Sequence, residues 1–391
     1  MSRRPLATSS AGAGWHRGLR SLLILLVLPP FLPLRASAET SFPPVVPGHE
    51  IAFPRDEGSH PDHRIEWWYV TGQLDDATSK VKAPRGFQVT FFRVRTGLAA
   101  DNPSKFAPRQ VLFAHAAIAD PATGKLHHAQ RSARAGFDLA YAREGSLDVK
   151  LDDWSIRQVA PGKYVTVCHG EDFDFELTLA STQPPLLQGE RGFSRKGPDP
   201  LAASYYYSLP QLAVTGEVTV GGRTLAVSGQ AWFDHEWSSD YVDESALGWD
   251  WLGVNMTDGG ALMAFRMRDR QGGERWAGAT LRLPSPGGAG DVKFAGVGEA
   301  TTFGPEAVHW APLQSWRSPR TGVTYPVQWR VQVGDRRYRV EPLLLDAELD
   351  SRPTTGILYW EGPIRLIDEA TGQEAGRGYL ELTGYGGKLD L

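Results

Sequence analysis

The segment GEVTVGGRTLAVSGQAW, residues 216–232, decides the fold class of this 391-residue chain. Apolar residues alternate with polar ones on both sides of Gly221-Gly222, and two glycines between alternating runs are typical of a tight β-hairpin. The same arrangement recurs at Asp258-Gly259-Gly260 and at Gln271-Gly272-Gly273. After the N-terminal segment, no long apolar stripe has helical spacing, so these patterns predict an all-β protein.

Further short alternating or β-branched runs occur along the chain between turn signals. They are GFQVTFFRVR (86–95), VLFAHAAIA (111–119), KYVTVCH (163–169) and FDFELTLAS (173–181). Antiparallel sheets must close or stack to protect their edge strands, and many short strands suit a barrel or a sandwich.

The first 38 residues are predicted to be a secretory signal peptide. Arg3-Arg4 and two further arginines precede the apolar run 22–34, and the small residues 36–38 have the form of a cleavage site. The apolar run is short for a membrane span and contains three prolines, so we expect no transmembrane anchor after its removal. A secreted or periplasmic protein, cleaved near Ala38, is therefore expected; the export route stays open.

Composition narrows the class of protein. Cys168 is the only cysteine, which excludes an intramolecular disulfide, and its strand-like neighbours predict a buried thiol. A formal net charge of −4 gives no reason to expect nucleic acid as a partner. The length suggests two domains, which we place at 39–240 and 241–391.

A weak internal repeat agrees with two domains. The segment IEWWYVTGQLDD (65–76) can be aligned with WDWLGVNMTDG (249–259), so that Glu66 matches Asp250. The runs that follow them then match Phe92-Arg93 with Phe265-Arg266. This alignment predicts two copies of one β unit, joined near 238–246, with a carboxylate beside a tryptophan in equivalent strands.

The run GQAWFDHEWSSDY (229–241) places ionisable groups among aromatic ones. Successive side chains of a strand point to opposite faces. One face would carry Phe233, His235 and Trp237, and the other Trp232, Asp234 and Glu236. Because neither face is purely apolar, we expect a shaped cavity on at least one of them.

Several motifs together resemble a known family. They are IEWWYVTGQL, FAHAAIAD, YYYSLPQLAVTGEVTVGG, SGQAWFDHEW, GWDWLGVNM, LYWEGPIRL and GRGYLELTGY, in this order over about residues 50 to 390. The chain is similar to the secreted AttH-like proteins, which share a two-domain architecture with carotenoid 1,2-hydratase (hydroxyneurosporene synthase). The resemblance implies two tandem lipocalin-like antiparallel β-barrel domains that bind a hydrophobic ligand. Close relatives are often described as secreted hydrolases of unknown substrate.

The hydratase branch of this family implies hydration of a carbon–carbon double bond. Protonating an alkene requires a carboxylic acid that an apolar environment keeps protonated near neutral pH, and aromatic faces can stabilise the carbocation. The resemblance carries over to the Asp-His-Glu-Trp segment and to Asp250. We therefore expect Asp250 to donate the proton, His235 to direct or deprotonate water, and Trp237 to lie beside them. The other residues expected around the ligand are Glu66, Trp68, His115, Tyr206, Asp234, Glu236, Trp249 and Glu361.

Less specific interpretations of these residues stay open. Glu66 and Asp250 could pair with Arg93 and Arg266 and simply anchor equivalent strands. His115 is expected to be a hydrogen-bonded core or pocket histidine rather than a catalyst. Glu361 could pair with a nearby arginine of its own strand.

Other functions also stay open. The main alternatives to a hydratase are a non-catalytic carrier of an isoprenoid or lipid, a secreted hydrolase and a structural envelope protein. A hydrolase lacks support because the chain has neither a Gly-x-Ser-x-Gly nor a His-Glu-x-x-His motif. The contiguous residues 234–236 cannot converge on one ion from a strand, so no metal and no cofactor are expected. Peripheral association with a membrane is left open.

Overall fold

The computed structural model describes residues 42–79, 84–98, 102–241, 246–284 and 297–387, and residues 40–391 form one compact unit. The predicted signal peptide lies outside the described residues. Within them, the one helix is a three-residue 3-10 turn, η1 (Arg55–Glu57), and no helix is long and apolar enough to cross a membrane.

The first sheet has 13 antiparallel strands in the order β4-β3-β2-β1-β13-β12-β9-β8-β7-β6-β5, with β10 and β11 paired to β12. Its strands are β1 (Ile65–Asp76), β2 (Arg85–Arg95), β3 (Gln110–Asp120), β4 (Lys125–Arg134), β5 (Ala140–Ala142), β6 (Asp148–Leu151), β7 (Trp154–Ala160), β8 (Lys163–His169), β9 (Phe173–Ala180), β10 (Leu186–Leu187), β11 (Phe193–Arg195), β12 (Ala203–Val220) and β13 (Arg223–Ser238). The two ends of this order approach each other through β4 and β6, so the sheet is a nearly closed barrel.

The second sheet has ten strands in the order β17-β16-β15-β14-β23-β22-β20-β19-β18, with β21 paired to β22. Its strands are β14 (Ala246–Met256), β15 (Ala261–Asp269), β16 (Glu274–Pro284), β17 (Val297–Phe303), β18 (Val308–Arg317), β19 (Thr324–Val333), β20 (Arg336–Pro342), β21 (Glu348–Ser351), β22 (Ile357–Asp368) and β23 (Glu374–Thr383). This sheet is a half-barrel. The predicted all-β class with two lipocalin-like units is therefore confirmed.

The glycine-rich turns lie where the sequence predicts them. Gly221 and Gly222 join β12 to β13 with φ angles of 55° and 76°, a left-handed conformation that glycine adopts without steric cost. The turns at 258–260 and 271–273 join β14 to β15 and β15 to β16.

The internal repeat appears in the strand registers. Glu66 of β1 is the cross-strand neighbour of Arg93 in β2, and Asp250 of β14 is the neighbour of Arg266 in β15. In each sheet the first long strand also pairs with the last one, β1 with β13 and β14 with β23. The two sheets therefore share one plan around equivalent carboxylate–arginine pairs.

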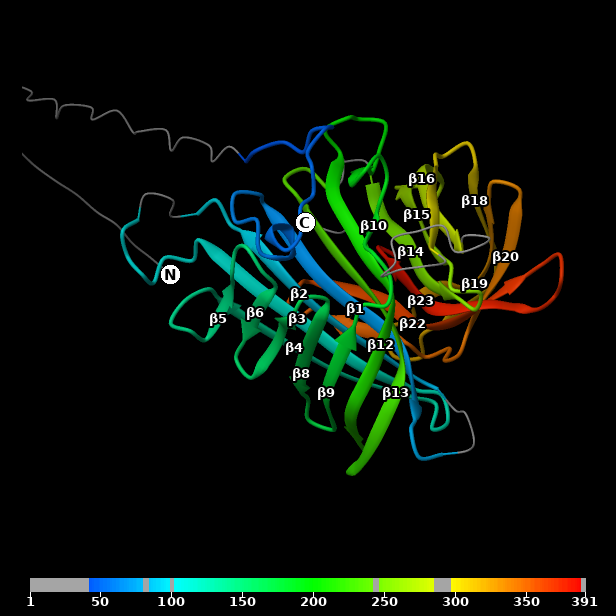
Figure 1. Ribbon diagram of the computed structural model, residues 1–391, viewed down its shortest axis with the longest axis horizontal. Coiled ribbons are helices and arrows are strands. Elements are labelled where there is room, and N and C mark those ends of the chain that lie inside the picture. Colours follow the sequence, from blue (N-terminus) through cyan, green and yellow to red (C-terminus); the bar gives the residue numbers. More distant parts are fainter. Residues whose placement is uncertain (1–41, 80–83, 99–101, 242–245, 285–296, 388–391) are drawn as a thin grey trace, which may run out of the picture. The chain divides into compact units, whose positions relative to one another are not determined.

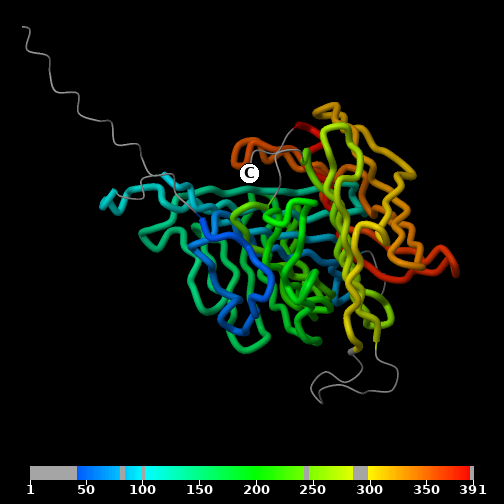
Figure 2. Tube along the Cα trace, turned by 90° about the horizontal axis from the view of Figure 1, so that it is seen from above, coloured from blue at the N-terminus to red at the C-terminus, as the bar shows by residue number. Residues whose placement is uncertain are grey.

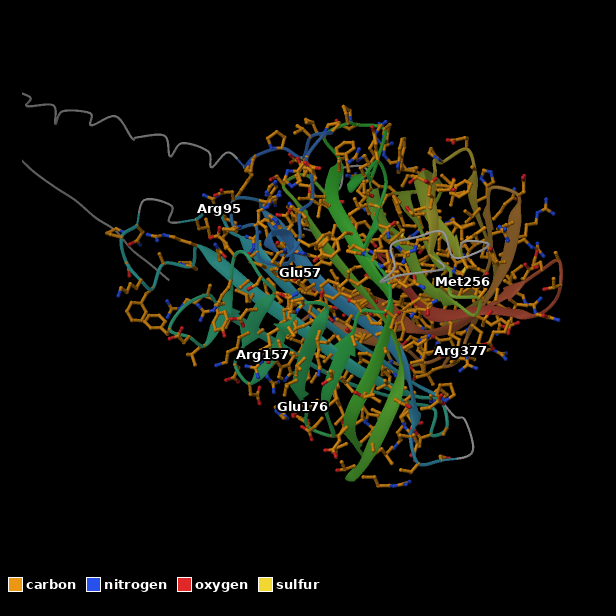
Figure 3. The ribbon with its side chains drawn as sticks, in the orientation of Figure 1. Glu57, Arg95, Arg157, Glu176, Met256 and Arg377 are labelled. Atoms are coloured by element: carbon orange, nitrogen blue, oxygen red, sulfur yellow. The ribbon has the colours of Figure 1, made fainter. Side chains whose placement is uncertain are left out.

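The 3-10 turn η1 covers one end of the first barrel. Glu57, labelled in Figure 3, accepts hydrogen bonds from Gln158 and from Tyr164 Oη at 2.7 Å. The indole of Trp68, buried inside the barrel, donates to the Glu57 carbonyl at 3.2 Å. The interior below is filled by apolar side chains and by the buried thiol of Cys168, as predicted.

The two sheets pack against each other through β1, β2, β22 and β23 (Figure 1). Figure 2 shows the strands of the first sheet, blue to green, adjoining those of the second, yellow-green to red. Gly86 is required at this contact, because an added Cβ would overlap the Tyr379 hydroxyl and the Pro363 ring. The packing leaves an aromatic cluster between the sheets that is separate from both interiors.

Candidate functional site

A cavity of about 290 Å³ lies between the two sheets. Strands β1, β2, β3, β12 and β13 line one side, and β14, β22 and β23 line the other. Many aromatic rings line it, those of Trp67, Tyr69, Phe92, Phe113, Tyr206, Tyr241, Trp249, Trp251 and Tyr359. Four carboxylic acids also line it: Asp234, Glu236, Glu361 and Glu381. We call this space the inter-sheet pocket.

The alternation of β13 decides which side chains reach the pocket. Asp234 and Glu236 line it, whereas His235 and Trp237 are buried on the opposite face, toward the interior of the first barrel. Within the tyrosine triplet of β12, Tyr206 is the one that lines the pocket. Strand β13 therefore carries aromatic and ionisable side chains on both faces. One face lines the inter-sheet pocket, and the other faces the interior of the first barrel.

Two acids of the pocket lie side by side on neighbouring strands of the second sheet. Glu361 of β22 and Glu381 of β23 are cross-strand neighbours, and Glu361 accepts a hydrogen bond from Tyr69 Oη across the sheet interface. Burial raises the pKa of Glu381 to about 8, despite a hydrogen bond from Trp249. Burial, and then the neighbouring Glu381, raises the pKa of Glu361 well above its ordinary value. Both groups therefore favour the neutral acid at neutral pH.

Asp234 is held differently, by three donors. It accepts hydrogen bonds from Tyr206 Oη at 2.8 Å, Trp232 Nε1 at 2.7 Å and Ser208 Oγ. Burial raises the pKa of Asp234 to about 7, although these bonds favour the ionised form. Trp251 Nε1 donates to Tyr206 at 3.1 Å, which ties this group to the second sheet. Asp234 can therefore exchange a proton near neutral pH.

Glu236 has a cationic partner. Lys196 Nζ lies 2.7 Å from Glu236 Oε1, both side chains are buried, and Ser204 donates to the same carboxylate. Lys196 Nζ also lies 4.5 Å from the Phe265 ring centroid and 4.8 Å from that of Tyr206. Burial raises the pKa of Glu236, and Lys196 opposes that shift.

His115 of β3 has partners on both ring nitrogens. Nδ1 lies 2.7 Å from Tyr359 Oη and Nε2 lies 3.0 Å from Thr354 Oγ1, both on the second sheet's side of the pocket. Burial lowers the pKa of His115 to about 3, so the ring is neutral at physiological pH. The geometry agrees with the expected hydrogen-bonded pocket histidine.

The expectation that Asp250 shares a cavity with Glu66, His235 and Trp237 is wrong. Asp250 does not line the inter-sheet pocket; its carboxylate lies 2.6 Å from Arg266 Nε and accepts a hydrogen bond from Tyr385 Oη at 3.0 Å. Alternation explains the error, because Trp249 and Trp251 face the pocket and the residue between them faces away.

Glu66, Trp68, His235 and Trp237 belong together, but at the capped end of the first barrel. Glu66 Oε2 lies 2.8 Å from Arg93 Nε, and Oε1 lies 3.0 Å from His235 Nε2. Trp68 stacks on the His235 ring at 4.8 Å. Glu66 and Asp250 are thus bound as anchors of equivalent strands, the less specific interpretation of the sequence.

Six of the eight residues expected around the ligand line the pocket. They are His115, Tyr206, Asp234, Glu236, Trp249 and Glu361. Glu361 is not paired with Arg365, which binds Glu341 instead. Sequence reasoning missed Glu381, Tyr69 and Lys196. The motif GRGYLELTGY contained the signal for Glu381, a carboxylate within an otherwise apolar alternating run.

Comparisons with known proteins agree with this architecture. The model of the AttH-like family matches residues 44–385. An AttH protein from Nitrosomonas europaea is 49% identical, with a TM-score of 0.78 over 88% of this chain and 99% of that chain. Kievitone hydratase from Nectria haematococca is 16% identical, with a TM-score of 0.63 over 89% of this chain and 97% of that chain, which is a likeness of fold. No curated protein matches the chain significantly.

Proposed function

This chain belongs to the AttH-like family, and from that premise we propose that it binds a hydrophobic small molecule in the inter-sheet pocket and adds water to a carbon–carbon double bond. The observation that carries the proposal is the pair of neighbouring carboxylic acids with raised pKa values, Glu361 and Glu381, in a pocket that is lined by many aromatic rings. A simple carrier has no use for such acids in contact with its ligand.

The reaction begins with proton transfer from the acid pair to one alkene carbon. The π electrons form the new C–H bond, and the other carbon becomes a carbocation. Water then attacks this carbon while Asp234 in its ionised form takes the water proton. The proton returns from Asp234 to the acid pair through solvent, so the net change is the addition of one water molecule.

The aromatic walls favour the intermediate. Tryptophan and tyrosine faces attract a cation with about 0.5–2 kcal/mol per ring, and Trp67, Trp249 and Trp251 line the pocket. Glu236, beside Lys196, adds a polar group that orients the ligand. The likeness to kievitone hydratase supports a hydratase as the first reaction to test, because that enzyme is named for this class of reaction.

A non-catalytic carrier of an isoprenoid or lipid is the second candidate. The mostly apolar lining of the pocket favours it equally. A hydrolase has less support, because the pocket histidine His115 contacts Tyr359 and Thr354 rather than a serine or cysteine nucleophile.

Export is a separate proposal. Basic residues before an apolar run and the small residues 36–38 support cleavage near Ala38 and a secreted or periplasmic location. N-terminal sequencing of the protein purified from its natural host tests this, and a start at Met1 contradicts it.

Mass spectrometry in heavy-oxygen water tests the proposed reaction. Wild type is incubated with an isoprenoid and lipid extract in water enriched in oxygen-18. A hydratase yields an intact product that is heavier by one labelled water, a hydrolase yields a labelled fragment, and a carrier enriches an unchanged molecule. Glu381→Gln should abolish the labelled product while the protein still retains the substrate.

The matched control is Glu348→Gln. Glu348 is a buried carboxylate that lies outside the pocket, where Ser318, Thr321 and Tyr325 donate hydrogen bonds to it. This variant should form product at the wild-type rate. An unchanged ligand retained by wild type and Glu381→Gln alike would contradict the hydratase and leave the carrier.

A further inference from the structure

A second cluster of titratable side chains lies at the capped end of the first barrel, away from the inter-sheet pocket. It contains His60, in the loop after η1, with Glu66 of β1 and His235 of β13. Glu66 and His235 are fully buried, and the His60 side chain is 16% exposed. The proposed reaction uses none of the three.

The ligand atoms of these residues converge. His60 Nδ1 lies 2.7 Å and His235 Nε2 lies 3.0 Å from the same oxygen, Glu66 Oε1. One nitrogen from each ring and a carboxylate oxygen all lie within 4.8 Å of one another. Two imidazoles and one carboxylate form a common ligand set for divalent transition metals.

The hydrogen bond between His235 and the backbone of Asp56 decides which ring nitrogen of His235 carries the hydrogen. His235 Nδ1 lies 3.0 Å from the Asp56 carbonyl oxygen, which can only accept, so Nδ1 carries the hydrogen. In the neutral ring, Nε2 then presents a lone pair to Glu66 Oε1. A lone pair and a carboxylate oxygen at this distance repel each other unless a proton or a metal ion binds to both atoms.

His60 repeats this arrangement. Its Nε2 lies 3.3 Å from Asp56 Oδ1, and its Nδ1 faces Glu66, so both nitrogens face carboxylates. If hydrogens alone made these contacts, both rings would be cationic with their centroids 5.6 Å apart, beside Arg93. One metal ion can take the place of the two converging hydrogens.

We propose that His60 Nδ1, His235 Nε2 and the Glu66 carboxylate bind one divalent transition metal ion, with Zn²⁺ as the best fit to these ligands. The contacts around the ligands are those of a built site. Arg93 Nε and Ser59 Oγ hold Glu66 Oε2 at 2.8 and 2.9 Å. The His60 backbone N–H lies 3.0 Å from both carboxylate oxygens, so Oε1 keeps a lone pair for the metal.

Aromatic rings cover the two histidines. Trp237 stacks on His60 at 3.8 Å and Trp68 stacks on His235 at 4.8 Å, which fixes both rings and limits water. The ion would fasten the loop after η1 to β1 and β13. No metal was expected from the sequence, because only the contiguous residues 234–236 suggested a ligand set. The proposed ligands come from three separate segments of the chain.

Metal analysis of the full chain tests this inference independently of the hydratase. Protein from zinc-supplemented cells is analysed by plasma mass spectrometry before and after dialysis against a chelator, and the apoprotein is titrated with Zn²⁺ and Co²⁺. We expect one equivalent per chain, a rise in melting temperature with Zn²⁺, and the visible absorption of protein-bound Co²⁺.

The variants locate the ion. His60→Ala and His235→Gln should lower metal affinity by at least about tenfold, and Asp56→Asn by about 10–100-fold, since it weakens the orientation of His60. His63→Ala is the control within the same loop and should bind like wild type. Wild type that binds no more metal than His60→Ala, or full binding in both ligand variants, would overturn the proposal.

Discussion

Glu361 and Glu381 are direct cross-strand neighbours in β22 and β23, and both line the inter-sheet pocket, where Glu361 is buried and Glu381 is partly buried. Like charges opposite each other in a sheet are destabilising, and two adjacent buried carboxylates cannot both ionise easily. At least one acid of the pair is therefore protonated at neutral pH, in the pocket where the proposed reaction needs a proton donor.

Stability should depend on pH through this pair. The pKa of Glu381 rises from an ordinary 4.5 to about 8 on folding, so the folded state binds more protons than the unfolded state between these values. The contribution of Glu381 to the free energy of unfolding should then be fully present below about pH 4.5 and be lost toward pH 8, at up to about 1.4 kcal/mol per pH unit. Urea unfolding across this range measures it. Glu381→Gln should flatten the slope, and an unchanged slope contradicts the shift.

Lys196 should contribute to stability through its charge. Lys196→Met leaves Glu236 buried without its cationic partner, which should cost about 3–5 kcal/mol in urea unfolding. Adding Glu236→Gln to the same protein should recover much of that loss, because the unpaired charge is removed. A single variant within about 0.5 kcal/mol of wild type would show that the pair carries no such energy.

The rate of hydration should show a narrow bell-shaped pH profile. Asp234, with a pKa of about 7, must be ionised to take the water proton, and Glu381, with a pKa of about 8, must be protonated. Turnover should therefore rise through about pH 7 and fall through about pH 8. Asp234→Asn should lower turnover and remove the rising limb. A rising limb that persists in this variant assigns it to another group.

Asp250→Asn should weaken the fold rather than the chemistry. The substitution removes a buried charge from Arg266, which should cost about 3–5 kcal/mol of unfolding free energy. Ligand retention and turnover below the melting temperature should stay at wild-type levels, because Asp250 does not line the pocket. Lost turnover with unchanged stability would restore Asp250 as the proton donor.

The sequence predicted much of the fold because local chemistry decides it. The left-handed turn of this hairpin favours glycine, which the chain supplies at Gly221 and Gly222. The alternation of apolar and polar residues on both sides predicts the two strands. The repeat of Glu66-Arg93 as Asp250-Arg266 is visible in the sequence because the same types of residue recur in the same order, although the loop between the two strands differs in length. That the second sheet forms only a half-barrel was not predictable, since the closure of a sheet depends on contacts between residues distant in sequence.

The site was predictable only in part. The period of a strand separates Asp234 from His235, but it does not say which face meets a pocket and which meets a barrel interior. For that reason His235, Trp237 and Asp250 were assigned to the chemistry, although all three face away from the pocket. The acid pair was missed because Glu361 and Glu381 become neighbours only through the register of β22 and β23.

The central claim is that a carboxylic acid in the inter-sheet pocket is protonated at neutral pH. Infrared difference spectroscopy of wild type against Glu381→Gln, at pH values from about 5 to about 9, measures this state directly through the C=O stretch of a neutral acid. We predict a neutral-acid band at pH 7 that is absent from the variant and disappears as the pH passes about 8. A carboxylate band at pH 7, with no neutral acid lost in Glu381→Gln, would contradict the account.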